Sequence, residues 1–559
     1  MTVKVNRRET LGIISAAAAA SCTPTANMKG ADAALSNDVF RHGVASGDPQ
    51  KDSVVLWTRI ETNLDSEPVR WEIARDAAFT DIVRSGEAFA KASADHTVKA
   101  IPDGLDPGAH YFYRFTARKR ISPVGQTRTL PEGATDRLGL AVASCSNYTF
   151  GFFNAYEAIA KDDDVDFVLH TGDYIYEYGA DEWGAETAKV IGRVHEPANE
   201  IVSLLDYRTR HAQYKRDAGS LAMHAAKPLI TLWDDHESAN NPWVGGAQNH
   251  QPDKEGDWIV RCANAIRAYY EWMPIRNPAL GEMPEEYWRT YVFGDLATLV
   301  TLESRHTARG EQVDYARYQT LLETDEDYEA FKRDVIGDPS RRMISEKMEG
   351  VLSAALAQSV ATGEPWRLIG NAIPMARMLV PDLVGKGYLP DPSNDENALD
   401  AAKRIAWLGK HELPFYTDTW DGYPAAREDF YKLCREAGAS DLLVLTGDSH
   451  SFWANRLFDG EGRQMGLEIG TSGISSPGDF VESGFDKETA ETLDRAFAAE
   501  LDEVLWTDNF HQGYVRLDLA REEAQAVYIA VDNLLTPEFK TITLRTDRIA
   551  KKGGTVDYV

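Results

Sequence analysis

An apolar run closes on polar side chains in the segment Val165-Asp166-Phe167-Val168-Leu169-His170-Thr171-Gly172-Asp173-Tyr174-Ile175-Tyr176-Glu177. Residues 165–169 predict a buried strand, because the run is short, mostly apolar and contains β-branched and aromatic side chains. The strand ends at a Gly-Asp pair, and Tyr176 follows three residues after Asp173. A carboxylate that can bridge two metals, beside a phenol that suits a hard trivalent ion, predicts a binuclear centre that contains iron.

Three other predicted strands, far apart in the sequence, end in the same way. Residues 138–144 close on Cys145, residues 228–233 close on Asp234-Asp235-His236-Glu237, and residues 441–446 close on Gly447-Asp448-Ser449-His450. Ligands gather outside the carboxyl ends of the strands in open α/β sheets. The sequence therefore predicts a metal cluster where these four strand ends meet.

From about residue 138 onward, strands alternate with helical patterns, which is typical of a layered α/β fold. We expect a central β-sandwich flanked by helices. Helices are predicted at residues 153–159, 204–214 and 263–272, with a long helical insertion over 315–336 and 345–362. Strands predicted at 464–469, 514–519, 526–530 and 541–544 are expected to complete the second layer of the sandwich.

Residues 38–130 predict a separate all-β sandwich of immunoglobulin-like type, because short apolar runs alternate there with turn signals. For the rest of the chain, we predict an export signal and linker at residues 1–30 and the metal-binding α/β domain at residues 136–548.

These ordered motifs resemble a divergent form of the calcineurin-like metallophosphoesterase pattern, that of the PhoD-type alkaline phosphatases. The match is densest over residues 200–243, and weaker similarity covers roughly the whole mature chain. The resemblance implies a metallophosphatase-like fold and a periplasmic or secreted phosphatase and phosphodiesterase. It also implies a centre of one Fe³⁺ with calcium.

Carried over motif by motif, the resemblance implies a specific ligand set. The iron ligands would be Cys145, Asp173, Tyr176 and His450. Asp173 would bridge to calcium, for which Asn240 and Asp448 are the implied ligands. Asp235 falls where many metallophosphatases place a ligand Asn, and His236 falls where they place the His that assists catalysis. Asp173 and His236 are therefore the expected catalytic residues. Glu303 stands where the family pattern leads us to expect Asp, which leaves its role open.

The residues themselves refine this set. Adjacent side chains of an extended segment point to opposite sides, so we expect Asp235 in the site and Asp234 in a supporting role. Two arginines, Arg208 and Arg305, could clamp a phosphate bidentately, and ion pairing is an equally good reading for each.

The composition limits the partners of the chain. Its 559 residues carry a net charge of −29, which argues against nucleic acid as a partner because such binding needs a basic surface. We expect a small-molecule or polymeric phosphate ester as substrate, with bound metals supplying the local positive charge. Two alternatives stay open: a Zn²⁺ or Mn²⁺ phosphodiesterase on the same scaffold, and a surface binding protein with an inert metal site.

The N-terminus predicts export. Asn6-Arg7-Arg8-Glu9-Thr10-Leu11 is twin-arginine-like, and the apolar stretch at 11–20 is too short to span a bilayer. Ordinary cleavage follows from this pattern, and lipidation at Cys22 is the alternative, which would give the only link to a membrane. Cys262 and Cys434 are most simply buried thiols, and a disulfide between them is the alternative.

Overall fold

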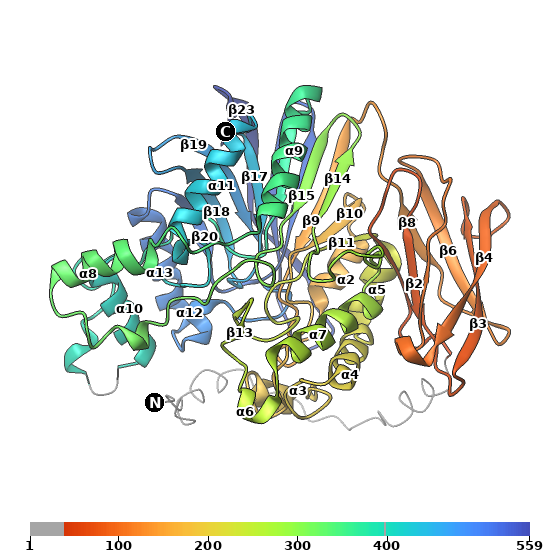
Figure 1. Ribbon diagram of the computed structural model, residues 1–559, viewed down its shortest axis with the longest axis horizontal. Coiled ribbons are helices and arrows are strands. Elements are labelled where there is room, and N and C mark those ends of the chain that lie inside the picture. The colour runs from red at the N-terminus through yellow and green to blue at the C-terminus, as the bar shows by residue number, and fades with distance from the viewer. Residues whose placement is uncertain (1–38, 396–397) are drawn as a thin grey trace.

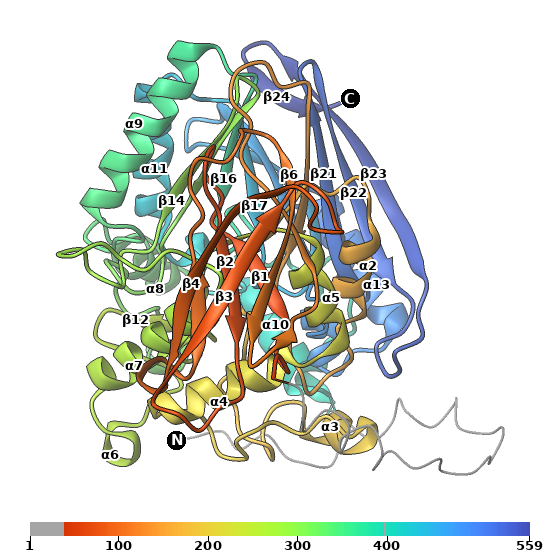
Figure 2. The same ribbon diagram turned by 90° about the vertical axis from the view of Figure 1, so that its right-hand side faces the viewer.

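Two large β-sheets pack face to face in the computed structural model, which describes residues 39–395 and 398–559. Helices cover the outer faces of both sheets, and a smaller all-β unit, orange in Figure 1, stands at one end. Figure 2, turned by 90°, shows this unit in front of the main body. The layered α/β class and the strand-rich N-terminal region expected from the sequence are confirmed.

The first large sheet carries three of the four ligand-bearing strand ends. Its described strands run in the order β24 (Thr555–Tyr558), β23 (Thr541–Lys552), β22 (Glu523–Val531), β21 (Gln512–Ala520), β9 (Arg137–Ala143), β10 (Phe167–His170), β11 (Leu229–Thr231), β1 (Val44–Gly47), β2 (Val55–Arg59) and β5 (Thr97–Ala100). Strands β9, β10 and β11 are parallel neighbours, with Leu169 opposite both Val142 and Ile230. Their carboxyl ends therefore lie side by side.

The second large sheet carries the fourth ligand-bearing end, on β17. Its described strands run in the order β14 (Arg289–Phe293), β15 (Ala297–Thr301), β16 (Trp366–Gly370), β17 (Leu442–Thr446), β19 (Gln464–Gly470), β18 (Phe452–Phe458) and β20 (Val504–Asp508). The two sheets bury one continuous core between them, to which Leu140, Leu169, Leu299, Leu368 and Val444 belong. The central strands β9, β10, β11, β16 and β17 are buried on both faces, which explains their near-continuous apolar runs.

The helices form the outer layers. Their bounds are α2 (Asn154–Lys161), α3 (Ala185–Ile191), α4 (Leu204–Lys215), α5 (Ala218–Ala226), α6 (Pro252–Glu255), α7 (Trp258–Trp272), α8 (Asp325–Phe331), α9 (Glu346–Thr362), α10 (Asp400–Lys410), α11 (Pro424–Glu436), α12 (Asp479–Glu482) and α13 (Lys487–Glu500). Helices α2, α4 and α7 share a core with the outer face of the first sheet, whereas α9 and α11 cover the second. A two-stranded ribbon, β12 (Pro242–Trp243) and β13 (Gly246–Ala247), lies in the loop that follows β11.

Two secondary-structure predictions were wrong in part. Of the four late strands, only β19 belongs to the second sheet, whereas β21, β22 and β23 extend the first through antiparallel pairing of β21 with β9. Apolar alternation identifies a strand but not its partner. The predicted helix over 315–336 is broken: a short 3₁₀ turn at Tyr315–Arg317 is separated from α8 by non-helical residues. A capping box between Thr324 and Asp327 starts α8 at that point.

The N-terminal region shares a sheet with the main body. Its outer sheet consists of β4 (Ile82–Lys91), β3 (Ser66–Ala74), β6 (His110–Ala117), β7 (Arg120–Ile121) and β8 (Gly125–Arg128). Its inner strands, by contrast, join the first large sheet through a parallel pairing of Gly47 with Leu229. A Cβ at Gly47 would lie 2.5 Å from the Leu229 carbonyl oxygen, so only glycine permits this junction.

Candidate metal centre

Four strand ends bring the predicted ligands together. Cys145 follows β9, Asp173 follows β10, and Asp448 with His450 follows β17; all four residues have positive φ, of 58°, 56°, 66° and 52° respectively. Such backbone conformations are costly for residues other than glycine and cluster at functional sites. The chain thus turns sharply after each strand, which aims the side chain back over the sheet edge.

The four residues implied as iron ligands meet in one place. One ligand atom each of Cys145, Asp173 and His450 lies within 4.8 Å of the others. The Tyr176 hydroxyl lies 2.9 Å from Asp173 Oδ2 and 3.2 Å from His450 Nε2. A thiol, a phenol, an imidazole and a carboxylate therefore converge on one point.

Surrounding groups orient these side chains. His450 Nδ1 lies 3.0 Å from the Pro477 carbonyl oxygen, which can hold the proton on Nδ1 and leave Nε2 free as a ligand. The Ser476 hydroxyl donates to the Tyr176 oxygen at 2.9 Å, and the Ser144 hydroxyl lies 3.0 Å from Cys145 Sγ.

A second group of ligands shares Asp173 with the first. Asp173, Asp235 and His236 offer atoms within 4.8 Å of one another, and so do Asp234, Asp235 and Asp448. Asp173 thus stands between the two groups, where a bridging carboxylate belongs. Asn240 lines the same cavity.

The cavity between these groups has a volume of about 290 Å³ and lies at the carboxyl edge of the two sheets. Its described lining comprises Asp173, Tyr178, Trp183, Asp235, His236, Asn240, Asn241, Tyr416, Asp418, Asp448, His450, Asp479 and Glu482. None of these lining residues is lysine or arginine. Carboxylates thus outnumber the cationic side chains that face them, and this imbalance favours bound cations.

The protonation equilibria point the same way. Burial raises the pKa of Asp173 and of Asp448 well above the usual range, and Asp235 and Asp234 respectively add to the rise. Burial likewise raises the pKa of the Cys145 thiol and of Tyr176, with Asp173 contributing next. Without a cation, these groups would hold their protons. Multivalent metal ions displace such protons, so the donor set fits metals.

Two buried oxygens strengthen this fit. Asp234 Oδ2 and Asp235 Oδ1 have no hydrogen-bond partner, although buried acceptors are almost always satisfied. The thiol, phenol and imidazole suit a transition metal such as iron, and the carboxylate and amide oxygens on the other side suit calcium. The residues present therefore fit a mixed binuclear centre.

His236 lies against this centre with its orientation fixed. Its Nδ1 lies 2.6 Å from Glu177 Oε2, and its ring centroid lies 4.2 Å from that of Tyr176. Burial opposes the charge on His236, but Asp235 and Glu177 outweigh burial and raise its pKa well above the usual range. An imidazolium whose Nδ1 is held by Glu177 keeps Nε2 for the cavity, which it lines.

The two arginines differ from the predicted phosphate clamp. Arg305 is fully buried and bonds to Asp234, Asp418 and Asp448, so its guanidinium orders carboxylates from three loops and is not open to a substrate. Arg208 does not reach the cavity: it forms a bidentate pair with Glu271 at 2.6 and 2.7 Å. Arg208 therefore does not stand where it could bind a substrate in the cavity, because α4 directs its side chain toward Glu271 on α7.

Two carboxylates hold the ligand loops and were not predicted. Glu237 accepts backbone N–H bonds from Asp173 at 3.1 Å, Tyr174 at 2.6 Å and Asp234 at 2.8 Å. Glu177 accepts the Asn240 N–H at 2.8 Å in addition to holding His236. Glu177 and Glu237 both stand in the motifs at the strand ends, so their position in those motifs was the sequence signal from which a role in the site could have been inferred.

Other predictions resolve as follows. Glu303 accepts backbone N–H bonds from Arg305, His306 and Thr307, which makes it a loop-stabilising residue. Cys262 and Cys434 are free thiols that pack in different cores, so the alternative of a disulfide between them is wrong.

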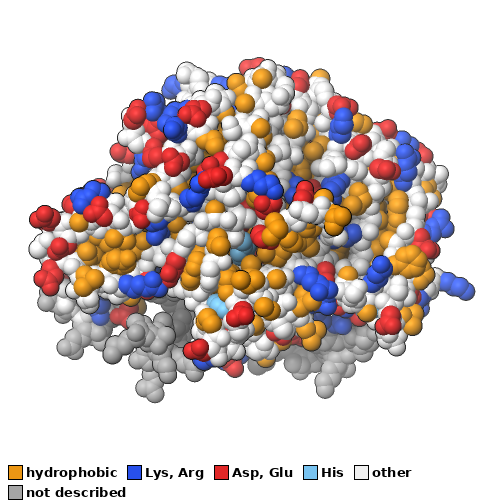
Figure 3. All heavy atoms as spheres, viewed as in Figure 1, with side chains coloured by type: hydrophobic (Ala, Val, Ile, Leu, Met, Phe, Trp, Pro, Cys, Tyr) orange, Lys and Arg blue, Asp and Glu red, His pale blue; other side chains and the backbone are white. Residues whose placement is uncertain are grey.

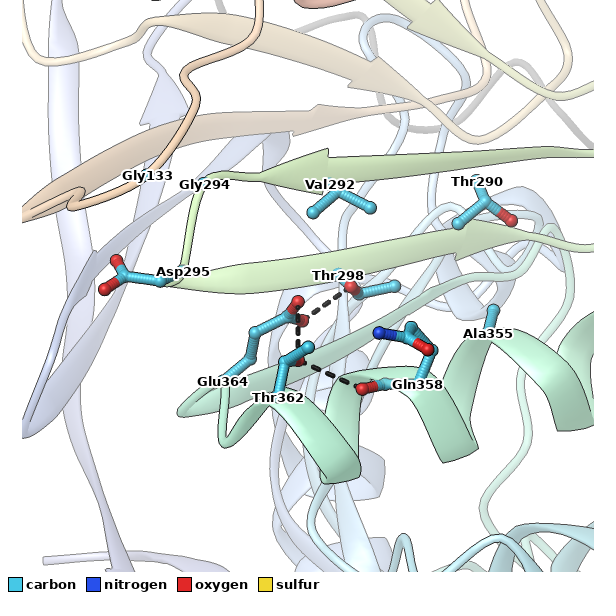
Figure 4. A pocket seen from close by; sticks show the side chains of 10 residues that line it. All are labelled: Gly133, Thr290, Val292, Gly294, Asp295, Thr298, Ala355, Gln358, Thr362 and Glu364. Carbon is cyan, nitrogen blue, oxygen red and sulfur yellow. Dashed lines mark hydrogen bonds between the residues drawn. The ribbon is translucent and has the colours of Figure 1, made fainter.

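A second hollow, of about 400 Å³, is unsuited to this chemistry. Figure 4 shows it between β14, β15 and α9. Its buried carboxylate, Glu364, accepts hydrogen bonds from Thr298 at 2.6 Å and Thr362 at 3.2 Å. Its described lining includes neither histidine nor cysteine, so the hollow offers no comparable ligand set.

Known proteins with a similar sequence and fold identify the family to which this geometry belongs. The family model described as PhoD-like phosphatase matches residues 140–528, and the model described as PhoD-like phosphatase, N-terminal domain, matches residues 24–131. Alkaline phosphatase D of Bacillus subtilis (strain 168) is 34% identical over 542 residues, which cover 92% of this chain and 81% of that protein. The solved structure of PhoD has a TM-score of 0.75 and 32% identity, over 93% of this chain and 92% of that one. The similarity thus spans both the N-terminal unit and the main body.

Proposed function

Because this chain belongs to the PhoD-like phosphatase family, we propose that it hydrolyses phosphate mono- or diesters at a centre of one ferric ion with calcium. The similarity makes the chain a phosphoric ester hydrolase of the alkaline phosphatase D type. The identity of its two metals is what we propose in addition. The observation that carries the proposal is the position of Asp173, which both ligand groups share. A carboxylate so placed can fix the spacing of two cations.

On one side of Asp173, the iron ligands would be Cys145, Tyr176 and His450. A thiolate and a phenolate both donate charge and favour the ferric state, so the ion would act as a Lewis acid without redox turnover. The short contacts of Tyr176 with Asp173 and His450 support this assignment.

On the other side, the calcium ligands would be Asp448 and Asn240, with Asp235 beside them. Calcium prefers oxygen ligands from carboxylates and amides. Asp235 Oδ2 accepts the Asn241 N–H at 2.8 Å, whereas Oδ1 has no hydrogen-bond partner and lies 3.7 Å from Arg305 Nη2, so Oδ1 is the atom proposed for the cation.

The reaction is metal-assisted hydrolysis. When bound, the cations offset the charge of the non-bridging phosphoryl oxygens and activate water for in-line attack. His236 would donate a proton through Nε2 to the leaving oxygen, since Glu177 holds its Nδ1. Arg305, behind the carboxylates, holds Asp234 and Asp448 in place through its ion pairs with both.

Elemental analysis paired with anomalous scattering tests the metal assignment. The expected result is iron between Cys145 and His450, calcium near Asp448, and a visible absorption band from the thiolate or phenolate bond to iron. A colourless, iron-free enzyme with full turnover would refute the assignment, and zinc or manganese at both positions would establish the alternative metal pair. Similarity to alkaline phosphatase D favours either enzyme over a binding protein with an inert site.

The substrate arrives as an anion at an acidic protein. On the face shown in Figure 3, Lys and Arg side chains are interspersed with Asp and Glu and form no single basic field, which supports a small or polymeric phosphate ester over nucleic acid as partner.

The proposed export signal at 1–30 and the alternative lipidation at Cys22 lie outside the described residues. Among the described helices, none is long and apolar enough to cross a membrane. We propose a periplasmic or secreted location, which changing Arg7 and Arg8 to Lys should abolish in a fractionation assay.

A further inference from the structure

The cavity has an outer half that the implied metal ligands do not explain. Tyr178, Trp183 and Tyr416 line it, together with Asp479 and Glu482 of α12. A site for anionic esters would be expected to present basic side chains here. Arg404 acts on Asp479 and Tyr416 from outside the lining, where it donates to the Phe415 carbonyl oxygen at 3.0 Å. The basic group within the lining is His236, whose ring lies 6.3 Å from that of Trp183 and whose Nδ1 is held by Glu177.

Trp183 is the centre of this outer half. Its ring centroid lies 5.6 Å from that of Tyr178 and 5.8 Å from that of His450, to which it is nearly parallel. The Phe150 ring supports it at 4.9 Å. The face of tryptophan binds cations best among the aromatic side chains. A group held against Trp183 would therefore lie directly beside the candidate metal ligand His450.

Two carboxylates complete the enclosure. Ligand atoms of His450, Asp479 and Glu482 lie within 4.8 Å of one another. Burial raises the pKa of Asp479 well above its usual range and raises that of Glu482 to about 7, so Glu482 is the acid that carries negative charge under alkaline conditions. Aromatic faces and carboxylates around one small space are complementary to an organic cation, because both attract positive charge and the rings also contact its apolar surface. The same carboxylates repel an anionic substituent.

We propose that this outer half binds an ammonium group on the substrate, so that the preferred esters are phosphodiesters of amino or trimethylammonio alcohols. This inference rests on the proposed hydrolase function, because it places the phosphate at the metal centre and the ammonium group against Trp183, Asp479 and Glu482. In the competing explanation, Asp479 and Glu482 bind a third metal ion together with His450, and not an ammonium group.

A matched pair of substrates isolates the ammonium group. p-Nitrophenyl phosphorylcholine and p-nitrophenyl 3,3-dimethylbutyl phosphate have the same shape and leaving group, but only the first carries a positive charge. For the metal-replete enzyme, kcat/KM should be about tenfold higher for the choline ester, the scale of a partly desolvated cation–π contact. Choline should also inhibit hydrolysis of the choline ester competitively.

Variants assign the preference to particular side chains. Glu482→Gln and Trp183→Leu should each reduce the preference at least severalfold by slowing the choline ester alone, whereas Trp183→Phe, which keeps an aromatic face, should retain most of it. The matched control is Glu488→Gln, an exposed acid on α13 outside the cavity, which should change neither ester.

The outcomes separate the two proposals. Equal kcat/KM for both esters in the wild type would overturn the ammonium site and leave the hydrolase intact. Hydrolysis of neither ester, together with no release of phosphate from the monoester p-nitrophenyl phosphate, would overturn the proposed function, and the ammonium site with it. If Glu482→Gln slows both esters equally and removes one bound metal ion by elemental analysis, the acids hold a third metal and the inference is wrong.

Discussion

Replacing Glu177 by Gln should move the alkaline limb of the activity profile to lower pH. Glu177 holds His236 Nδ1 at 2.6 Å and belongs to none of the candidate metal groups, so only His236 Nε2 faces the group that His236 shares with Asp173 and Asp235. His236 is nearly buried, and carboxylates raise its pKa above the usual range. A raised pKa keeps the imidazolium protonated as pH increases, which preserves a proton donor under alkaline conditions.

The shift follows from the hydrogen bond that is lost. A hydrogen bond to a charged group contributes about 1.5–3 kcal/mol, which is the scale of the interaction that Glu177 makes with the imidazolium. Glu177→Gln retains the acceptor oxygen for Asn240 but removes the negative charge, so the pKa of His236 should fall. The sign is downward, because the group that stabilised the protonated imidazole is now neutral.

The assay is kcat/KM against pH with a chromogenic diester, using metal-replete enzyme. The control is Glu186→Gln, an exposed acid in the first turn of α3, which should leave the profile unchanged. An unmoved alkaline limb in Glu177→Gln, with metal content preserved, would refute the reasoning. A uniform loss at every pH would show instead that Glu177 acts through the loop that carries Asn240.

Four further outcomes are expected. Asp173→Asn should reduce turnover by about three orders of magnitude or more with an unchanged circular dichroism spectrum, and near-normal turnover would remove the bridging role. Tyr176→Phe should shift or abolish the visible band of the iron-loaded enzyme, and an identical spectrum would exclude the phenolate ligand. Arg305→Met should destabilise the metal-free protein by about 3–5 kcal/mol in urea unfolding, because three buried carboxylates lose their cation, and added calcium should recover part of that loss. Arg208→Ala should leave KM unchanged, since its guanidinium is committed to Glu271, and a tenfold rise in KM would return it to the substrate site.

The strand ends could be predicted because their signals are local. A short apolar run followed by a Gly-Asp pair or by Cys145 identifies both the strand and the point where a polar side chain leaves the sheet. The rule that ligands gather at carboxyl ends then brings Asp173 and Asp448 together without knowledge of which sheet each strand joins. The structure places their strands in different sheets, packed face to face.

Other parts of the site have no such local signal. Trp183 and Glu482 lie in a loop and a four-residue helix, and only the packing of those segments around His450 brings them to the cavity. The sequence also does not distinguish the roles of Arg208 and Arg305. In the structure, Arg208 pairs with Glu271 away from the cavity, whereas Arg305 is buried among carboxylates.

The sequence by itself determined which side chains stand at the ends of buried strands, because the alternation and length of apolar runs are properties of neighbouring residues. Only the tertiary structure decided which strands are neighbours, that Asp173 is shared by two ligand groups, and that aromatic and acidic residues enclose the outer half of the cavity. Those relations arise from packing between segments hundreds of residues apart, for which short-range periodicity carries no information.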